Sequence, residues 1–459
     1  MGPMRRTLTP ELERWLGTTP RKALVLRGAR QVGKTWLVRD LARRAGLTLI
    51  EVNLERNPEL ARPLLELGPQ AALADLTLDH PDPPSPARCL LFLDEVQEAP
   101  EVLARLRWFT EELPELAVVA AGSLLEFALA EHAFSMPVGR ITYRFVEPLA
   151  FDEFLMAHGE AQVHERLLAW EPGEELTPTL HARAMESYDR FAMTGGMPAV
   201  VEADTRGAEP AELRGLQSDL VQTYRDDFAK YAQRLPRAEL NLVLASVAAQ
   251  LGSKFVYARV DDSIKHQHAK RALELLRDAR VITLASHSHA TGIPLGATAD
   301  TKRRKAFFLD VGLAHALMNT PAGAAFPAFA ALADAVRGAL AEQLVAQQVR
   351  APLGPRGAEP VLHYWQRSGG RAGELDFVLQ IDQRIVPVEV KSGSAGKMKS
   401  LHQFMADRAL DFAVRIDRNP PSVQDLDLTT TQGDPVRYRL LSLPGYLLFR
   451  LTAVAAAAR

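Results

Sequence analysis

The sequence has 459 residues, of which 47% are apolar and 24% charged; this composition excludes a disordered chain, a collagen-like fibre and a disulfide scaffold. With 54 Lys and Arg against 56 Asp and Glu, the formal net charge is −2, which excludes a uniformly basic nucleic-acid coat but not a local basic patch. The single cysteine, Cys89, cannot form an internal disulfide, and we expect neither a signal peptide nor a membrane span, so we predict a cytoplasmic protein.

The first 148 residues alternate between short apolar runs and helical patterns. Continuous apolar runs are typical of strands that are buried on both faces of a parallel sheet. They lie at residues 23–27, 47–53, 89–93 and 117–121, with helical patterns at 35–45 and 101–113 between them. The alternation predicts an α/β domain with a parallel sheet over residues 1–148.

Residues 28–35, GARQVGKT, match G-x-x-x-x-G-K-[ST] between a predicted strand and a predicted helix. Glycines allow backbone N–H groups to curl around phosphate oxygens, so we expect the loop itself to bind ATP. The loop residues are Gly28, Ala29, Arg30, Gln31, Val32 and Gly33. Lys34 would reach the β- and γ-phosphates, and Thr35 would bind Mg²⁺. The structural alternative is a glycine-rich turn that matches by coincidence.

The apolar run at 89–93 ends in two acids, Asp94 and Glu95. An acid at the carboxyl end of a central strand lies at the edge where α/β sheets bind ligands. Asp94 would hold Mg²⁺, and Glu95 would polarise the attacking water, which predicts hydrolysis. The alternative is an acid pair that complements the dipole of the next helix.

Three further residues are candidates for the same chemistry. Ser123 follows the run at 117–121 and could contact the γ-phosphate or the water, or cap a helix at 124–130. Arg140 or Arg144 could act as an arginine finger on a neighbouring subunit, which would make the protein a homo-oligomer. An ordinary surface arginine is the alternative for each.

The middle of the chain predicts two helical units. From residue 149 to 236 the pattern is helical with a break at 194–198, which predicts a helical lid. Two amphipathic patterns at 240–251 and 264–278, followed by a β-type run at 281–285, predict a winged helix over 237–304. Residues 251–305 carry 11 Lys and Arg against 5 Asp and Glu, and include the basic run 302–305, so we expect DNA contact here. The alternative is a solvated helix face and a basic loop.

A hairpin is predicted near residue 380. If Asp382 and Gln383 form a two-residue turn, opposed residues have numbers that sum to 765, so Asp376 faces Glu389 and Glu374 faces Lys391. Two carboxylates at that spacing repel each other unless a cation lies between them, which points to a second Mg²⁺ site beside Lys391. The alternative is an ion-pair lattice with a Glu374–Lys391 salt bridge, and a slip of one residue would separate Asp376 from Glu389.

These motifs together resemble a bacterial and archaeal branch of the AAA+ ATPases that carries a C-terminal domain of unknown function. The resemblance covers about residues 5–410 and rests on GARQVGKT, FLDEVQEAP, AAGS, GR before EPLAFDEFL, TGGMPAVV, KAFFLDVGL and ELDFVL…VPVEVKSG. It implies an AAA+ P-loop core with a lid, a winged helix, and a restriction-endonuclease-like α/β domain over 305–459. In that PD-(D/E)xK-type fold Glu342 would add an acid from a helix, although Leu375, and not Pro, precedes Asp376.

From these observations we expect an ATPase that couples its nucleotide cycle to DNA binding or processing. Two alternatives stay open. One is an ATP-dependent nuclease that uses Mg²⁺ at Glu342, Asp376 and Glu389. The other is a nucleotide-dependent switch or scaffold that acts on a protein partner.

Overall fold

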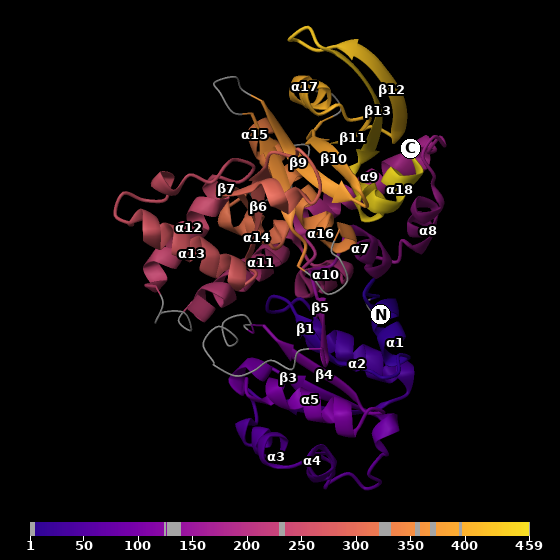
Figure 1. Ribbon diagram of the computed structural model, residues 1–459, viewed down its shortest axis with the longest axis vertical. Helices are drawn as coiled ribbons and strands as arrows, with labels where there is room; N and C mark the ends of the chain where they lie inside the picture. The colour runs from indigo at the N-terminus through magenta and orange to yellow at the C-terminus, as the bar shows by residue number, and fades with distance from the viewer. Residues whose placement is uncertain are drawn as a thin grey trace.

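The computed structural model describes residues 5–123, 125, 139–228, 235–320, 332–353, 359–367, 373–393 and 397–458. Two sheets organise these residues, one of five strands and one of eight. In Figure 1 the five-stranded sheet lies in the lower body, coloured indigo to violet, and the eight-stranded sheet lies in the upper body, coloured orange to yellow. The α/β fold class that the sequence predicts is confirmed.

The five-stranded sheet is parallel throughout, with the strand order β2-β3-β4-β1-β5. The four predicted apolar runs are its strands β1 (Ala23–Arg27), β2 (Thr48–Asn53), β3 (Cys89–Asp94) and β4 (Ala117–Gly122). The sequence reasoning missed the edge strand β5 (Ile141–Phe145), whose residues are all half-buried. Thr142 and Arg144 interrupt the apolar residues of β5, so it lacks the continuous apolar run by which we recognised the other four strands.

Helices cover both faces of this sheet. Alternate residues of β1 point to opposite faces, so Leu24 and Leu26 pack with α1 and α2, whereas Val25 packs with α3, α4 and α5. The helices are α1 (Thr9–Leu16), α2 (Lys34–Ala45), α3 (Ala61–Glu66), α4 (Pro69–Leu76) and α5 (Val102–Glu112). The sheet is thus buried on both sides, and its carboxyl edge is left for the loops that carry the site.

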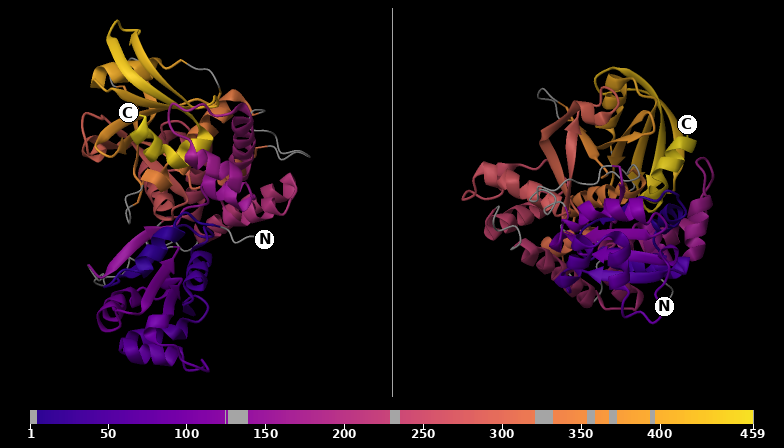
Figure 2. Two further views of the ribbon diagram at one scale, coloured as in Figure 1. Left: turned by 90° about the vertical axis from the view of Figure 1, so that its right-hand side faces the viewer. Right: turned by 60° about the horizontal axis from the view of Figure 1, so that its bottom comes forward.

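The described residues of the predicted lid form five helices (Figure 2, magenta). They are α7 (Phe151–Ala157), α8 (Ala161–Ala169), α9 (Pro178–Thr194), α10 (Pro198–Thr205) and α11 (Pro210–Asp227). The break between α9 and α10 falls where the sequence predicts it. Gly196 packs so closely there that an added Cβ would lie 2.1 Å from the Leu149 carbonyl oxygen, so a larger residue would push the lid away from the β5–α7 connection.

The two helices of the expected winged helix are α12 (Arg237–Ala249) and α13 (His266–Asp278). The hairpin after them, β6 (Ile282–Ser288) and β7 (Ala299–Phe308), forms one edge of the eight-stranded sheet because β6 pairs in parallel with β8. The strands that we expected to be the wing of a separate unit therefore belong to the second sheet, and the expected boundary at residue 304 falls inside β7. Pairing with a strand that lies so much later in the chain leaves no local sequence signal.

The eight-stranded sheet has the order β12-β13-β11-β10-β9-β8-β6-β7 and mixes parallel and antiparallel pairs. Its later strands are β8 (Leu362–Gln366), β9 (Glu374–Ile381), β10 (Arg384–Val390), β11 (Phe412–Asp417), β12 (Ser422–Thr429) and β13 (Pro435–Pro444). The accompanying helices are α14 (Val311–Leu317), α15 (Asp334–Gln348), α16 (Arg350–Leu353), α17 (Lys399–Arg408) and α18 (Leu451–Ala457). In the ranges that the structure describes, every helix is too short or too polar to cross a membrane.

Candidate nucleotide-binding site and carboxylate cluster

The glycine-rich loop leaves the carboxyl end of β1 and curls before α2 begins. Gln31 and Gly33 have left-handed backbones, with φ of 62° and 93°. At Gly28 an added Cβ would lie 2.5 Å from the carbonyl oxygen of Val146, whose N–H donates to the Arg27 oxygen over 2.7 Å. Successive N–H groups in such a curl form a concave anion site, and Gly28 has to be glycine for the loop to pass this close to the chain after β5.

Lys34 spans this loop from its far end. Its Nζ donates to the carbonyl oxygens of Gly28 at 3.0 Å and Ala29 at 2.8 Å, and the side chain is 7% exposed. Both partners are neutral oxygens at the start of the loop. A phosphate oxygen would form a shorter and stronger, charge-assisted bond with the same ammonium. Lys34 is therefore placed to exchange its loop contacts for a phosphate.

Thr35 and Asp94 meet at the carboxyl edge of the sheet. The Thr35 hydroxyl donates to Asp94 Oδ2 over 2.9 Å, and Asp94 is 3% exposed. Burial raises the pKa of the Asp94 carboxyl, while the bond from Thr35 opposes that shift. A hydroxyl and a carboxylate are hard oxygen donors, so the pair fits the Mg²⁺ that accompanies ATP, with phosphate and water as the remaining ligands.

Glu95 follows Asp94 in the chain, and the side chain of Gln97 contacts its carboxylate. Its own backbone is left-handed, with φ of 51°, and its Oε2 accepts a bond of 2.6 Å from Gln97 Nε2. Gln97 in turn lies over the end of β4, where an added Cβ on Gly122 would be 2.4 Å from Gln97 Oε1. The following residue, Ser123, is buried and its hydroxyl has no hydrogen-bond partner among the described residues.

The structure thus brings Glu95 and Ser123 to one edge of the sheet and adds Gln97, which the sequence reasoning missed. No periodicity or spacing rule distinguishes Gln97 from the other polar residues of FLDEVQEAP. The helix that Ser123 could cap, at residues 124–130, lies largely outside the described residues.

The lid contacts the glycine-rich loop at Arg30. The Arg30 guanidinium binds Asp227 over 2.8 Å and Glu55 over 3.4 Å, and Tyr224 donates to the Arg30 carbonyl oxygen over 2.8 Å. Tyr224 and Asp227 both belong to α11. Because the Arg30 guanidinium is bound by two carboxylates, only the backbone N–H of Arg30 is expected to contribute to ATP binding. The same contacts connect the loop mechanically with the lid.

The two candidate arginine fingers lie elsewhere in the core. Arg140 directly precedes the amino end of β5. Its carbonyl oxygen accepts a hydrogen bond from the Ala23 N–H, and its Nε binds Glu111 over 2.8 Å. The glycine-rich loop follows the opposite, carboxyl end of β1. Arg144 binds Glu11 over 2.8 Å. Within one chain, Arg140 therefore lies at the edge of the sheet opposite the loop, and action on a second copy stays a prediction.

The hairpin register near residue 380 agrees with the expected one. Arg384 pairs with Ile381 and Val388 with Phe377, so each pair sums to 765. Asp376 accepts a bond of 2.7 Å from the Val390 N–H, and Lys391 Nζ lies 2.5 Å from Glu389 Oε1.

The alternative to a metal site was an ion-pair lattice with a Glu374–Lys391 salt bridge, and the structure shows an ion-pair cluster with different partners. Glu374 instead binds Lys305 over 2.5 Å, and Lys305 also binds Glu342 over 2.8 Å. The Lys305 side chain is fully buried, and its Nζ lies 5.5 Å from the centroid of the Tyr364 ring. Lys391 therefore pairs with Glu389, while Glu374 pairs with Lys305 of β7.

The charges of this cluster depend on one another. Burial and neighbouring acids raise the pKa of Glu342 to about 8 and that of Glu389 to about 7, and burial also raises the pKa of Asp376. Burial alone would lower the pKa of Lys305, but Glu342 and Glu374 outweigh it, so Lys305 stays protonated. Two ammonium groups thus face four carboxyl groups, and retained protons reduce the remaining negative charge.

The described residues give the possible second Mg²⁺ site no support. Among the described residues, no group of three or more His, Cys, Asp or Glu side chains is arranged to hold a metal ion, the trio Glu342, Asp376 and Glu389 included. The physical reason is Lys305, because its ammonium uses Glu342 and would repel a divalent cation at the same place. The sequence reasoning had counted Lys305 with the basic run 302–305, but β7 is buried in the fold from Lys305 to its end.

The basic surface around α13 is partly as expected. Exposed cations lie on and beside this helix at Lys265, Lys270, Arg271 and Lys302. His268 contacts Glu239 over 2.9 Å, and Arg304 lies 3.6 Å from Glu274. The candidate DNA surface therefore consists of the outward face of α13 and Lys302, without Arg304 and Lys305.

Comparisons with known families divide the chain into three stretches. Residues 20–155 match a family model described as "AAA domain", residues 185–323 match "Domain of unknown function (DUF8612)", and residues 337–419 match "Domain of unknown function (DUF4143)". No curated protein sequence matches the chain at a significant level. The first match agrees with the P-loop geometry, and together they support a P-loop ATPase core of AAA type that binds ATP.

Solved structures that match the chain have low sequence identity to it and low TM-scores. The ORC1 protein of Aeropyrum pernix in complex with DNA is 14% identical, with a TM-score of 0.27. The match covers 70% of the present chain and 94% of the ORC1 chain. The ORC2 protein of the same organism, in ADPNP and ADP complexes, is 15% identical over the same shares with a TM-score of 0.39. PCH-2 of C. elegans is 11% identical, with a TM-score of 0.26 and coverage of 42% and 58%. Superpositions this loose transfer no residue role to the chain.

Proposed function

We propose that the chain binds ATP with Mg²⁺, hydrolyses it, and uses this cycle to change the DNA binding of the surface around α13. One observation carries the ATPase part, namely that the curled loop, the Thr35–Asp94 pair and Glu95 meet at one edge of the parallel sheet. A P-loop without an acid beside it would support binding alone. An acid next to the Mg²⁺ ligands supports hydrolysis.

Each side chain has a distinct task in this proposal. The N–H groups of the loop and the Lys34 ammonium bind the phosphates, and Thr35 and Asp94 hold the metal. Bound Mg²⁺ supplies charge stabilisation for the phosphoryl group as it is transferred. Glu95 orients the attacking water and accepts its proton. Gln97 holds the Glu95 carboxylate, and the buried Ser123 hydroxyl is free to bind the water or the γ-phosphate.

Contacts of the lid support a link from the nucleotide to the second body. At one end of the lid, Tyr224 and Asp227 bind Arg30 of the loop. At the other end, Asp310 of the second body accepts a bond of 2.6 Å from Gly196, and His315 bonds the Ala192 carbonyl over 2.9 Å. A change at the loop can therefore reach α14, the helix that begins beside β7.

DNA is the proposed target because the cations of α13 are exposed and lie on one helix. Phosphate contacts by Lys and Arg provide the sequence-independent part of DNA affinity. Cleavage is not part of this proposal, because Lys305 occupies the carboxylate cluster that a metal-dependent nuclease would need.

The ATPase proposal is tested with Glu95→Gln. This variant should still bind ATP, while turnover falls at least about tenfold because the water loses its base. Glu112→Gln, an exposed acid at the end of α5, serves as the charge-matched control and should turn over like the wild type. Unchanged turnover in Glu95→Gln would refute the role of Glu95.

The DNA proposal is tested by fluorescence anisotropy with labelled duplex over a range of salt. Binding through phosphates makes log affinity fall linearly with log salt, and Lys270→Ala/Arg271→Ala should reduce that slope by about 0.9 per lost contact. The control, Arg62→Ala/Arg107→Ala, removes two exposed charges from the surface of the P-loop domain and should leave the slope unchanged. If the wild-type ATPase rate is the same with and without DNA, and no salt-dependent DNA binding is found, the results favour a switch that acts on a protein partner.

A further inference from the structure

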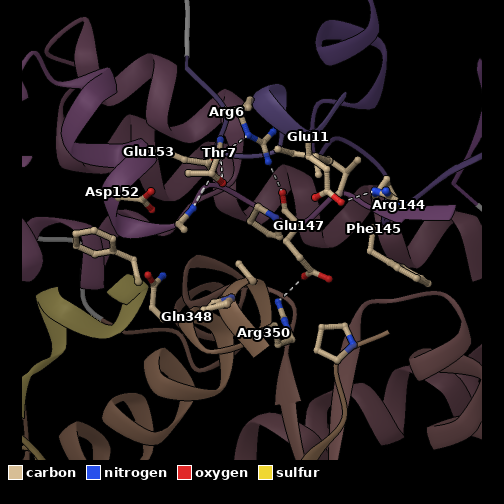
Figure 3. A pocket seen from close by; sticks show the side chains of 18 residues that line it. Arg6, Thr7, Glu11, Arg144, Phe145, Glu147, Asp152, Glu153, Gln348 and Arg350 are labelled. Atoms are coloured by element: carbon tan, nitrogen blue, oxygen red, sulfur yellow. Dashed lines mark hydrogen bonds and ion pairs between the residues drawn. The ribbon is translucent and has the colours of Figure 1, made fainter. Parts of the chain in front are cut away.

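A cavity of about 300 Å³ lies where the N-terminal segment meets the β5–α7 connection and α16 (Figure 3). Arg6 lies on its wall, is 5% exposed, and joins three parts of the molecule. Its Nη1 donates to the Val32 carbonyl of the glycine-rich loop over 2.9 Å, and its Nη2 donates to the Glu147 carbonyl over 2.7 Å. Its Nε binds Glu153 of α7 over 3.1 Å. All three guanidinium nitrogens are thus engaged.

The bond to Val32 constrains the peptide that the phosphate would use. The Val32 carbonyl and the Gly33 N–H belong to one planar trans peptide, so they point in opposite directions. By holding the carbonyl on its own side, Arg6 turns the Gly33 N–H to the other side. Gly33 has φ of 93° and few steric restrictions, so this peptide could otherwise rotate easily.

The anchor behind Arg6 is itself well held. Glu153 accepts bonds from the Thr7 N–H at 2.6 Å, the Thr7 hydroxyl at 3.0 Å and the Ala150 N–H at 3.0 Å. Because Glu153 neutralises much of the Arg6 charge, Arg6 orients the Val32–Gly33 peptide and does not attract phosphate from a distance. A planar guanidinium can serve three fixed acceptors at once, which a lysine cannot do with the same geometry.

Glu147 extends the contact to the second body. Its carboxylate binds Arg280 over 2.8 Å and Arg350 over 2.9 Å, and Figure 3 shows Arg6, Glu147 and Arg350 following one another along the cavity. Burial disfavours the Glu147 charge, but Arg350 and Arg280 outweigh it and lower the pKa of the carboxyl. The peptide that Arg6 holds is therefore supported from the C-terminal half of the chain.

We infer that Arg6 is a positioning residue of the nucleotide site, which sets the direction of the Val32–Gly33 peptide for phosphate binding. This inference rests on the proposed ATPase function. It assigns no contact between Arg6 and the nucleotide. It predicts that loss of Arg6 weakens the binding of ATP in molecules that are otherwise folded.

The test uses the full chain and measures both N-methylanthraniloyl-ATP binding with Mg²⁺ and steady-state ATP hydrolysis. In Arg6→Gln, Kd for the analogue and KM for ATP should rise about tenfold, the equivalent of one lost hydrogen bond. Arg6→Lys should restore part of the affinity. Arg5→Gln, the exposed neighbour, is the matched control and should bind like the wild type.

The KM separates positioning from stability. If Arg6 supported folding alone, fewer molecules would be active, so kcat would fall while Kd and KM stayed at wild-type values; that result would overturn the inference. If Arg6→Gln does not fold, an unchanged KM in folded Arg6→Lys would overturn it equally. Lys34→Met distinguishes the two proposals, because a wild type that binds the analogue no better than Lys34→Met contradicts the proposed function itself.

Discussion

The glycine-rich loop and the carboxylate cluster both place a buried lysine beside acids at the end of buried strands, yet the two lysines differ in what they bind. Lys34 contacts two neutral carbonyls of its own loop. Lys305 contacts two carboxylates that come from α15 and β9. The first ammonium donates to loop carbonyls that a phosphate can replace, whereas the second is held by carboxylates of the fold.

The comparison shows that the partner of a buried charge, more than its residue type, separates a ligand site from a structural ion cluster. A buried ion pair loses strongly when one member is removed, because the other is left uncompensated in a medium of low dielectric. A lysine on carbonyls can change partners at little cost. Four variants break or sharpen this difference.

Lys305→Met should have the largest effect. It leaves Glu342 and Glu374 buried without their ammonium, so we expect the free energy of unfolding to fall by about 3–5 kcal/mol. Urea denaturation measures the loss, and hydrogen exchange localises it to β7 and β9. Lys302→Met, an exposed position on the same strand, is the control and should change stability by less than about 0.5 kcal/mol. A loss below about 1 kcal/mol in Lys305→Met would contradict the structural role of that lysine.

Lys34→Met should have the opposite profile. ATP turnover should fall at least about a hundredfold, since the ammonium that binds the β- and γ-phosphates is gone. The free energy of unfolding should change by about 1 kcal/mol or less, because the lost partners are neutral carbonyls. ATPase rates and urea denaturation on one preparation give both numbers. Turnover within threefold of the wild type would remove Lys34 from the site.

The pH dependence of stability should report the excess of carboxyl groups in the cluster. The folded state raises the pKa of Glu389 from 4.5 to about 7, so it binds a proton that the unfolded state releases. The resulting stability is fully present below about pH 4.5 and is lost as pH rises through about 7. The loss is at most about 3.5 kcal/mol, since one pKa unit corresponds to about 1.4 kcal/mol.

Glu389→Gln should flatten the decline in stability between about pH 4.5 and 7. Urea denaturation at several pH values measures it, and Glu59→Gln, an exposed acid of the core, should keep the wild-type slope. Identical slopes in the wild type and Glu389→Gln would show that Glu389 is ionised like an exposed acid.

Arg140→Ala should have the smallest effect on stability, less than about 0.5 kcal/mol, because its bond with Glu111 is solvent-exposed. If Arg140 completes the nucleotide site of a second copy, turnover per chain rises with protein concentration, and this rise disappears in Arg140→Ala. Arg107→Ala, which removes another exposed partner of Glu111, is the control. A concentration-dependent rate that survives in Arg140→Ala would exclude Arg140 as the finger.

Sequence reasoning located the elements whose signal is local. The strands β1 to β4 were recognised because each is a largely apolar run, and the break at 194–198 because it contains two glycines and a proline. The register of β9 and β10 followed from a two-residue turn and counting. The edge strand β5 was missed, since it has no continuous apolar run and its residues are all half-buried.

The residues that were missed or misplaced act over long distances in the chain. Arg6 binds Glu147 and Glu153, Gln97 lies over Gly122, and Lys305 binds Glu342 and Glu374. Each is an ordinary polar residue in its own neighbourhood. Lys305 was read as part of a basic run because its sequence neighbours are basic.

By itself, the sequence determined the glycine-rich loop, the acids that follow β3 and the alternation that makes a parallel sheet, because these depend on residues that are adjacent in the chain. The tertiary structure decided which charges are neutralised. Whether a lysine or a carboxylate is available for a ligand depends on the strand that folds against it, and the pairing of β6 with β8 brings β7 and its lysine into the carboxylate cluster. Electrostatic interactions act through space, so the order of residues does not reveal them.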